Sequence, residues 1–190
     1  MAYDPETDLR VLEAMAASLT PYLYEKELYG VMAQNLPRLT VGGLLLRLYR
    51  LSSLQESLDG DQEKRFRDSR INFEQLRSEW AVHYESKIQQ EINARLNGIA
   101  NFLSDYASDP TAARGGYPNE ATQRTIIYHL QVEAMSLDIW DEDYEKRLAP
   151  LDKRLQAALK DSEKKFIWDD ELAPVYPEDP FWWLYGVPTD

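Results

Sequence analysis

The feature that most constrains this chain is one apolar pattern that runs from Gln62 to about Ala107. Apolar residues return there every three or four positions, which is the spacing of one face of an α-helix. They are Phe66, Phe73, Leu76, Trp80, Tyr84, Ile88, Ile92, Leu96, Ile99, Leu103 and Tyr106. At ~1.5 Å per residue, a continuous helix of this extent would exceed ~60 Å, more than the expected width of a compact domain. We predict a mostly continuous long helix, with Asn97-Gly98 as the place where it would break.

Proline residues and capping residues predict the elements that precede the long helix. Asp4-Pro5 offers an N-cap followed by proline at the first helical position, which starts a first helix. Thr20-Pro21 repeats this signal, so we expect a second helix over Pro21–Leu36 that ends before Pro37. A third helix is expected over Thr40–Leu58, with the threonine as its cap.

After the long helix, the stretch "SDPTAARGGYPN" at 108–119 predicts a surface loop, because its proline and glycine residues disfavour regular structure. We expect helix to resume at Glu120 and to be kinked or split by Pro150. The acidic run "DIWDEDYE" at 138–145 lacks the glycine of a calcium-binding loop and keeps the helical apolar phase. It is therefore expected to form a solvated helix face.

These patterns predict an all-α fold, because no stretch alternates as a strand does and no internal repeat occurs. We expect an antiparallel helical bundle of about five to six helices, organised on one long central helix. A length of 190 residues suffices for one substantial core. We expect the bundle to occupy residues 1–168, and residues 169–190 to form an extended tail, rich in aromatic residues and proline, that packs on the bundle or on a second subunit.

Charge and composition narrow the functional classes. A net charge of -12 repels phosphate backbones, so no nucleic-acid partner is expected. Zero cysteines exclude thiol chemistry and are compatible with a reducing compartment. The start "MAYDPETDLR" lacks the basic and apolar regions of a signal peptide, and the most apolar run, 39–51, is too short to span a bilayer. We expect a cytoplasmic protein with no membrane association.

Two histidine–glutamate pairs are the candidate metal ligands. Glu79 and His83 are four positions apart on a predicted helix, and so are His129 and Glu133. Side chains at this spacing share a helix face, so each pair offers one oxygen and one nitrogen ligand. Carboxylate-bridged di-metal bundles use a different spacing and additional glutamates. The other interpretation is therefore two structural histidines hydrogen-bonded to acids.

Other catalytic patterns are weaker. No nucleophile-elbow sequence accompanies the serine and threonine residues, and abundant acidic residues make any carboxylate pair uninformative. The stretch "TVGGLL" at 40–45 could direct backbone amides toward an anion, but it lacks the lysine and the spacing of a phosphate loop. We favour the interpretation that its glycines allow close approach between helices.

The C-terminal stretch "PEDPFWWLYG" has an unusual density of aromatic residues. Large aromatic side chains each bury about 150–250 Å² and are costly to leave in water. Three placements remain open: packing on the tail's own bundle, packing on a neighbouring subunit, or docking as a peptide in another protein's groove. No surrounding motif supports sugar stacking or cation recognition by its tryptophans. The residues expected to make the contacts are Tyr176, Phe181, Trp182, Trp183 and Tyr185.

Together these features predict a non-catalytic protein-interaction or scaffold module. We expect it to self-associate, as a dimer in the favoured case, through the long helix or the tail, and to require no cofactor. The alternative is a metal-binding helical-bundle protein that holds a divalent transition metal with the two histidine–glutamate pairs.

Overall fold

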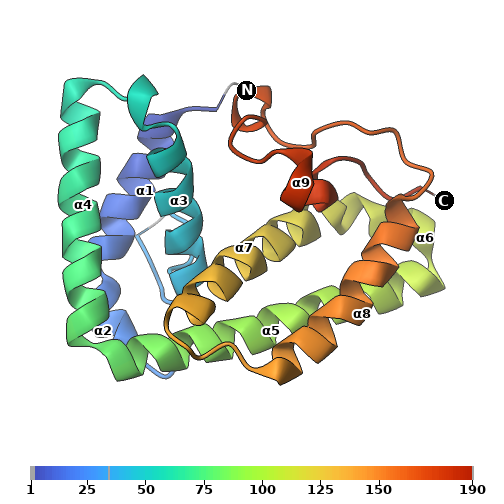
Figure 1. Cartoon of the computed structure of the whole chain (residues 1–190), viewed down its shortest axis with the longest axis horizontal. Helices are drawn as coiled ribbons and strands as arrows, with labels where there is room; N and C mark the ends of the chain where they lie inside the picture. Colours follow the sequence, from blue (N-terminus) through green and yellow to red (C-terminus); the bar gives the residue numbers. More distant parts are fainter. Residues whose placement is uncertain (1–2, 34, 190) are drawn as a thin grey trace. The chain divides into compact units, whose positions relative to one another are not determined.

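The computed structural model describes residues 3–33 and 35–189, and no β-strand occurs among them. The predicted all-α class is confirmed (Figure 1). In chain order the α-helices are α1 (Pro5–Ala17), α2 (Leu19–Tyr24), α3 (Val41–Ser53), α4 (Gly60–Glu79), α5 (Ala81–Ser108), α6 (Pro110–Ala113), α7 (Tyr117–Ser136), α8 (Glu142–Leu159) and α9 (Glu178–Phe181). Short 3-10 turns are η1 (Gln55–Ser57), η2 (Arg114–Gly116), η3 (Asp170–Leu172) and η4 (Trp182–Leu184).

The chain forms two compact units, and helix α5 contributes residues to both. The N-terminal unit is Asp4–Glu91, and the C-terminal unit contains the chain from Ile92 onward. The predicted tail segment, 169–190, falls in the same compact unit as the helices that precede it.

In the N-terminal unit, α1 packs against both α3 and α4. Asp8 on α1 lies within 3.5 Å of Arg47 and 3.4 Å of Arg50 on α3. The start of α1 thus lies beside the second half of α3. At the other end, a Cβ on Gly43, at the start of α3, would lie 3.8 Å from Met15, near the end of α1. Helix α3 therefore runs antiparallel to α1. The shared interior is apolar, with Leu9, Leu12, Met15, Leu44, Leu51 and Phe66 buried.

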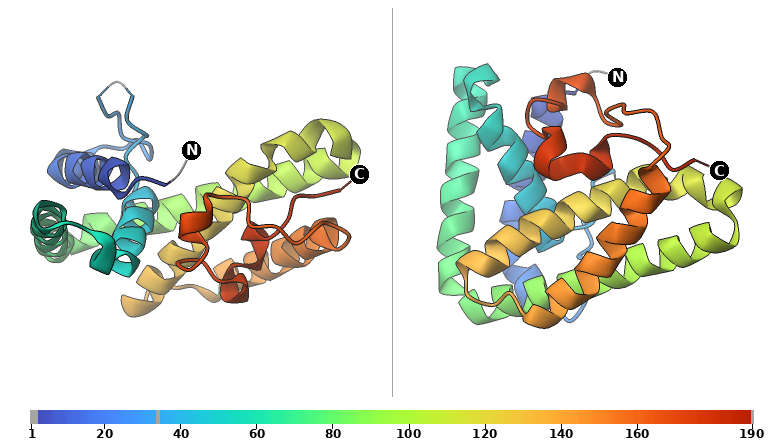
Figure 2. Two further views of the ribbon diagram at one scale, coloured as in Figure 1. Left: turned by 90° about the horizontal axis from the view of Figure 1, so that it is seen from above. Right: turned by 45° about the vertical axis from the view of Figure 1, so that its right-hand side comes forward.

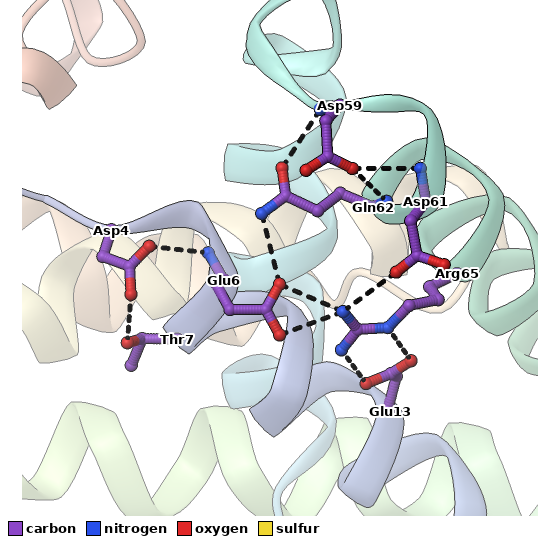
Figure 3. A network of polar contacts seen from close by, with 8 residues as sticks. All are labelled: Asp4, Glu6, Thr7, Glu13, Asp59, Asp61, Gln62 and Arg65. Carbon is purple, nitrogen blue, oxygen red and sulfur yellow. Dashed lines mark hydrogen bonds and ion pairs between the residues drawn. The ribbon is translucent and has the colours of Figure 1, made fainter.

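A charged cluster centred on Arg65 joins α4 to α1 (Figure 3). The Arg65 guanidinium donates to both carboxylate oxygens of Glu13, at 2.9 and 2.7 Å, and to Glu6 at 3.0 Å. These two carboxylates raise the pKa of Arg65 above its ordinary value. At the start of α4, the Asp59 side chain accepts from the backbone of Gln62, which completes a capping box. The sequence "DGD" at 59–61 thus forms the start of α4.

The prediction of a helix over 21–36 is wrong. Helix α2 ends at Tyr24, and the following segment folds back so that Gly30 and Leu39 exchange backbone hydrogen bonds of 2.9 and 3.0 Å. Gly30 permits this turn, because a Cβ there would lie 2.8 Å from the Tyr22 ring. Figure 2 shows the described residues between α2 and α3, 25–33 and 35–40, extending away from the helices of their unit. Local helix signals were overridden here by tertiary contacts.

The predicted long helix is divided, but at Trp80 and not at Gly98. Trp80 has φ -112° and ψ 33° and separates α4 from α5, so α4 ends at Glu79. Helix α5 then continues through Gly98 without interruption. Gly98 is exposed, and a Cβ there would contact nothing within 4 Å. An exposed helical glycine costs only about 1 kcal/mol relative to alanine, so the burial of its neighbours Leu96 and Ile99 keeps the helix intact.

In the C-terminal unit, α7 and α8 pack on the later part of α5. The ring of Tyr117, at the start of α7, lies 6.1 Å from that of Phe102 near the end of α5, so these two helices run antiparallel. Helix α8 runs parallel to α5, because Arg147 donates to Asn97 at 3.1 Å and Arg154 donates to the backbone oxygen of Leu103 at 2.8 Å.

Two further expectations for this unit are wrong. The segment 108–119 is not an irregular loop, because it contains α6 and η2, and α7 begins at Tyr117. The helix expected from Glu120 onward stops at Ser136, where Asp138 adopts φ 59° and Asp141 caps α8 by accepting from the backbone of Asp143 at 2.7 Å. The acidic run thus forms a connection and a cap.

Helix α8 continues through Pro150 to Leu159 instead of splitting there. Pro150 is exposed, and the buried side chains of Leu148, Leu151 and Leu155 hold both halves of the helix on one apolar face. Among the described residues, no helix has the length and apolar content that crossing a membrane requires.

Candidate interaction sites

The aromatic tail is anchored to its own unit through Trp183. This side chain is 1% exposed, and its Nε1 donates to the hydroxyl of Thr125 at 2.9 Å. The hydroxyl of Tyr117 donates to the backbone oxygen of Trp183 at 2.7 Å. The Arg124 guanidinium carbon lies 4.0 Å from the centre of the Trp183 ring, and the same guanidinium donates to both carboxylate oxygens of Asp152 at 2.7 and 2.8 Å. The indole is thus held by a hydrogen bond at its edge and a cation at its face.

The other tail residues expected to make contacts also lie in this unit. Tyr176 and Phe181 are buried, and Trp182 and Tyr185 are half-buried. The Phe181 ring stands edge-on to Tyr128 of α7, with 4.8 Å between ring centres. Figures 1 and 2 show α9 against α7. The structure thus gives these side chains partners within their own unit, while a role for them at a subunit interface stays a prediction.

The tail and the segment after α8 together frame an open cleft with a volume of about 790 Å³. The backbone of Ile167 donates to Leu184 at 3.0 Å, which ties the two segments side by side. Gly186 has φ 131°, and a Cβ there would lie 2.3 Å from the Ser162 hydroxyl. The close approach of these segments therefore requires glycine at 186. Residues 163 and 165–171 line the cleft, and Pro118, Gly186 and Val187 complete it.

The cleft combines aromatic walls with carboxylates. Trp168 stands edge-on to Tyr176, with 5.0 Å between ring centres and an angle of 87°, and this contact orients its indole. The lining carboxylates are all exposed, and none forms an ion pair or a side-chain hydrogen bond with another described residue; they are Glu163, Asp169, Asp170 and Glu171. Lys165 is the one basic residue in the lining. We define this set of residues as the tail cleft.

His83, a predicted metal ligand, belongs to an aromatic cluster. Its ring centre lies 5.1 Å from that of Tyr24 and 6.3 Å from that of Trp80, and the last two are 4.9 Å apart. Glu79 is the last residue of α4, whereas His83 lies in α5, so the break at Trp80 removes the shared helix face on which this pair was predicted. Tyr24 is 54% exposed. We call Tyr24, Trp80 and His83 the aromatic cluster.

His129 is buried in the C-terminal unit, close to tail aromatics. Its ring centre is 6.1 Å from that of Tyr176 and 6.4 Å from that of Phe181. Glu133 does follow it on the same helix, α7. Among the described residues, however, no group of three or more histidine, aspartate or glutamate side chains is arranged to hold a metal ion. The observed surroundings of both histidines are mainly aromatic.

At the start of α3, the backbone amide of Gly42 does point at a carboxylate, but this carboxylate belongs to the chain itself. The amide of Gly42 donates to the carboxylate of Glu91 at 2.8 Å, and the amide of Gly43 donates to the Thr40 hydroxyl at 3.0 Å. Glu91 is fully buried. A side-chain carboxylate at a helix N-terminus is stabilised by the amides and by the helix dipole. This position is therefore structural, and the capping role predicted for Thr40 is confirmed.

A buried lysine fixes the segment that follows α2. Lys87 is 2% exposed, and its Nζ donates to the backbone oxygens of Glu25 and Glu27 at 2.8 and 2.7 Å. The same nitrogen lies 4.3 Å from the centre of the Tyr22 ring. Burial lowers the pKa of Lys87 below its ordinary value, although the nearby glutamates oppose this shift. These contacts explain why the chain leaves the helical path at this point.

Comparison with protein families, curated proteins and solved structures found no match to this chain.

The residues of the tail cleft were not predicted from the sequence. Their signal is the run "FIWDDE" at 166–171, in which Phe166, Ile167 and Trp168 directly precede three acidic residues. Abundant acidic residues elsewhere made this run inconspicuous. Its position opposite Gly186 and Val187 arises from pairing across the tail, which no local pattern encodes.

Proposed function

We propose that this protein is a non-catalytic protein-interaction module and that its tail cleft is the main binding surface. The single observation that supports this most strongly is the open cleft of about 790 Å³, lined by indole and phenyl rings and by carboxylates without partners. Pockets of this size and mixed character are typical binding sites. The tail contributes Gly186 and Val187 to the lining, and Tyr176 orients the lining indole of Trp168.

The residue types in the cleft favour binding over catalysis. Its polar side chains are carboxylates and one lysine, and no histidine, serine or threonine lines it. Acid–base catalysis by two carboxylates needs groups in contrasting environments. All four carboxylates of the tail cleft are exposed and thus share a similar environment.

A capture experiment tests this proposal. Full-length tagged protein, its Trp168→Ala variant and a Trp182→Ala variant are compared for the proteins they retain from source-cell extract after crosslinking. We expect at least one protein to be retained by the wild type and by Trp182→Ala but lost from Trp168→Ala, because Trp168 lines the cleft whereas Trp182 does not. Identical retention by all three proteins would contradict a binding role for the cleft.

Self-association is a second part of the proposal, and the exposed aromatic cluster supports it. Tyr24 is 54% exposed, and Val82, next in the chain to His83, is 77% exposed. Exposed aromatic and aliphatic side chains in proximity are typical of interfaces. We expect a dimer whose stability rises with salt, because each chain carries a net charge of -12 and added salt screens the repulsion.

Sedimentation equilibrium of the wild type and of a Tyr24→Ser, Val82→Ser variant tests this second part. We expect the wild type to form a dimer. The dissociation constant of the variant dimer should be at least about tenfold higher, because the variant lacks two interface side chains. A wild type that stays monomeric at every salt concentration would overturn self-association and leave the tail-cleft proposal intact.

A further inference from the structure

The chemistry of the tail cleft identifies the kind of ligand that it would accept, on the premise that the proposed function is correct. We propose that the cleft binds an arginine side chain of a positively charged partner segment, with the guanidinium against Trp168 and paired with the neighbouring carboxylates.

The charge of the lining excludes most alternatives. Four carboxylates face one lysine, so an anionic ligand would be repelled. A metal ion is disfavoured, because the carboxylates form no group of three ligands among the described residues. An organic cation remains, since its charge is spread over several atoms and can be neutralised by carboxylates that do not converge on one point.

The backbone that carries these carboxylates is ordered by local hydrogen bonds. Asp169, Asp170 and Glu171 lie at the start of η3, where the amide of Leu172 donates to the backbone oxygen of Asp169 at 2.9 Å and that of Ala173 donates to the backbone oxygen of Asp170 at 3.1 Å. None of the three carboxylates has an ion-pair partner among the described residues. Their charge is thus available to a ligand without first breaking an internal contact.

The aromatic wall favours arginine over lysine. Guanidinium groups stack on aromatic faces and bind carboxylates through two parallel hydrogen bonds, whereas an ammonium group is a compact point charge. The Trp168 indole is oriented by Tyr176 and by Phe166, whose ring centres lie 5.0 and 6.3 Å away. It is half-buried, so part of its surface remains open.

The same unit contains an internal precedent for this arrangement. Arg124 lies over the Trp183 ring at 4.0 Å and donates to both oxygens of Asp152. Tryptophan, arginine and aspartate thus form a compact group inside the fold. At the cleft, a tryptophan and an aspartate are again neighbours, because Trp168 directly precedes the exposed Asp169 and both line the cleft.

The test is binding of a short fluorescent peptide of alternating arginine and alanine, measured by anisotropy at low and moderate salt with the full-length protein. We expect saturable binding that weakens as salt rises. The Trp168→Ala variant should bind about fivefold or more weakly, and Trp168→Phe, which keeps an aromatic face, should lose less. A peptide in which lysine replaces arginine should bind more weakly than the arginine peptide.

Charge variants provide the matched control. The cleft triple variant carries Asp169→Asn, Asp170→Asn and Glu171→Gln together. It should weaken binding of the arginine peptide about tenfold or more. The triple variant Asp68→Asn, Asp105→Asn, Glu145→Gln removes the same charge at exposed positions outside the cleft and should change binding less than about twofold. Lys165→Gln should tighten binding, and a gain of affinity cannot arise from misfolding.

Absence of peptide binding would overturn the inference, and so would equal weakening of binding by the two triple variants. A third contradicting result would be that free argininamide displaces the fluorescent peptide at the same concentration as the unlabelled peptide does. The last would assign the cleft to a small cation instead of a polypeptide. If the peptide fails to bind while extract capture still depends on Trp168, the inference is wrong and the proposed function stands. If both fail, the tail cleft is not a binding surface.

Discussion

At the scale of single residues, Trp183 shows how this chain accommodates a large amphipathic side chain. Its indole nitrogen, its backbone oxygen and its ring face each have a partner, namely Thr125, Tyr117 and Arg124. Burial raises the pKa of Tyr117 above the ordinary tyrosine value, which keeps its hydroxyl protonated as a donor. Trp183 is therefore an anchor of the tail at which apolar burial and polar satisfaction coincide.

Substitution of Trp183 should reveal both contributions. We expect Trp183→Ala to lower the free energy of unfolding by about 3–5 kcal/mol, as for other buried tryptophans. Trp183→Phe should cost less, since it keeps an aromatic ring, but it leaves the Thr125 hydroxyl without the indole donor. Urea denaturation measures both variants, with Trp182→Ala at a half-buried neighbouring position as the control. A control as harmful as Trp183→Ala would contradict the anchor role.

Glu120 introduces a pH dependence at the start of α7. Burial raises the pKa of its carboxyl group above the ordinary glutamate value, and the hydrogen bond from Asn119 only partly opposes this. In the pH range between the unfolded and folded pKa values, the folded state binds more protons than the unfolded state, so stability falls as pH rises. Ionised Glu120 is therefore destabilising at neutral pH.

We accordingly expect Glu120→Gln to raise the melting temperature at neutral pH, and this gain to shrink as the pH falls and the Glu120 carboxyl group of the folded protein takes up a proton. Thermal melts across this pH range measure the effect, with Glu145→Gln at an exposed position of α8 as the control. A gain that is constant with pH would exclude titration of Glu120 as its cause.

At the scale of elements, the caps were predictable and several helix ends were not. Asp4 and Thr40 cap α1 and α3 as their local sequence indicates. The end of α2 was not predictable, because it depends on a contact with Lys87. The Nζ of Lys87 donates to the backbone oxygen of Glu25 at 2.8 Å, and the two residues are 62 positions apart in the sequence. Local pattern cannot encode such a contact.

The division at Trp80 has a similar explanation. Apolar residues keep helical phase on both sides of it, so periodicity alone predicts continuity. The Trp80 ring instead packs edge-on to Tyr24 of α2, with ring centres 4.9 Å apart. Gly98, the more obvious breaker, stays helical because its helix buries residues on either side of it. Tertiary packing therefore outweighed residue propensity at both positions.

Gly186 tests whether pairing across the tail maintains the cleft. We expect Gly186→Ala to destabilise the protein by about 1–3 kcal/mol, because alanine is strained at positive φ. The added Cβ would also displace the segment at Ser162. Denaturation measures the cost. Gly115→Ala, where a Cβ meets nothing within 4 Å, serves as the control. Equal stability of both variants would show that the two segments do not approach as closely as described.

At the scale of the whole molecule, the sequence predicted the all-α class but not the division into two compact units. The long apolar pattern was interpreted as one central helix. It forms two helices, α4 and α5, and α5 contributes residues to both units. The tail aromatics were identified as contact residues, yet the cleft beside them was missed. Its residues are separated in sequence and meet only after the tail pairs with the segment that follows α8.

The net charge of -12 connects the two parts of the functional proposal. Added salt should strengthen association between two like-charged copies and weaken binding of a basic segment. The two activities are therefore distinguishable in a single salt series without any substitution.

The most direct test of the central claim is amide hydrogen exchange of the full-length protein with and without the arginine–alanine peptide. We predict that the peptide slows exchange in residues 163, 165–171 and 186–187, which line the tail cleft, and leaves residues 41–79 unchanged. Slowed exchange confined to other segments, or no change at a peptide concentration that saturates binding, would contradict the assignment of the tail cleft as the binding surface.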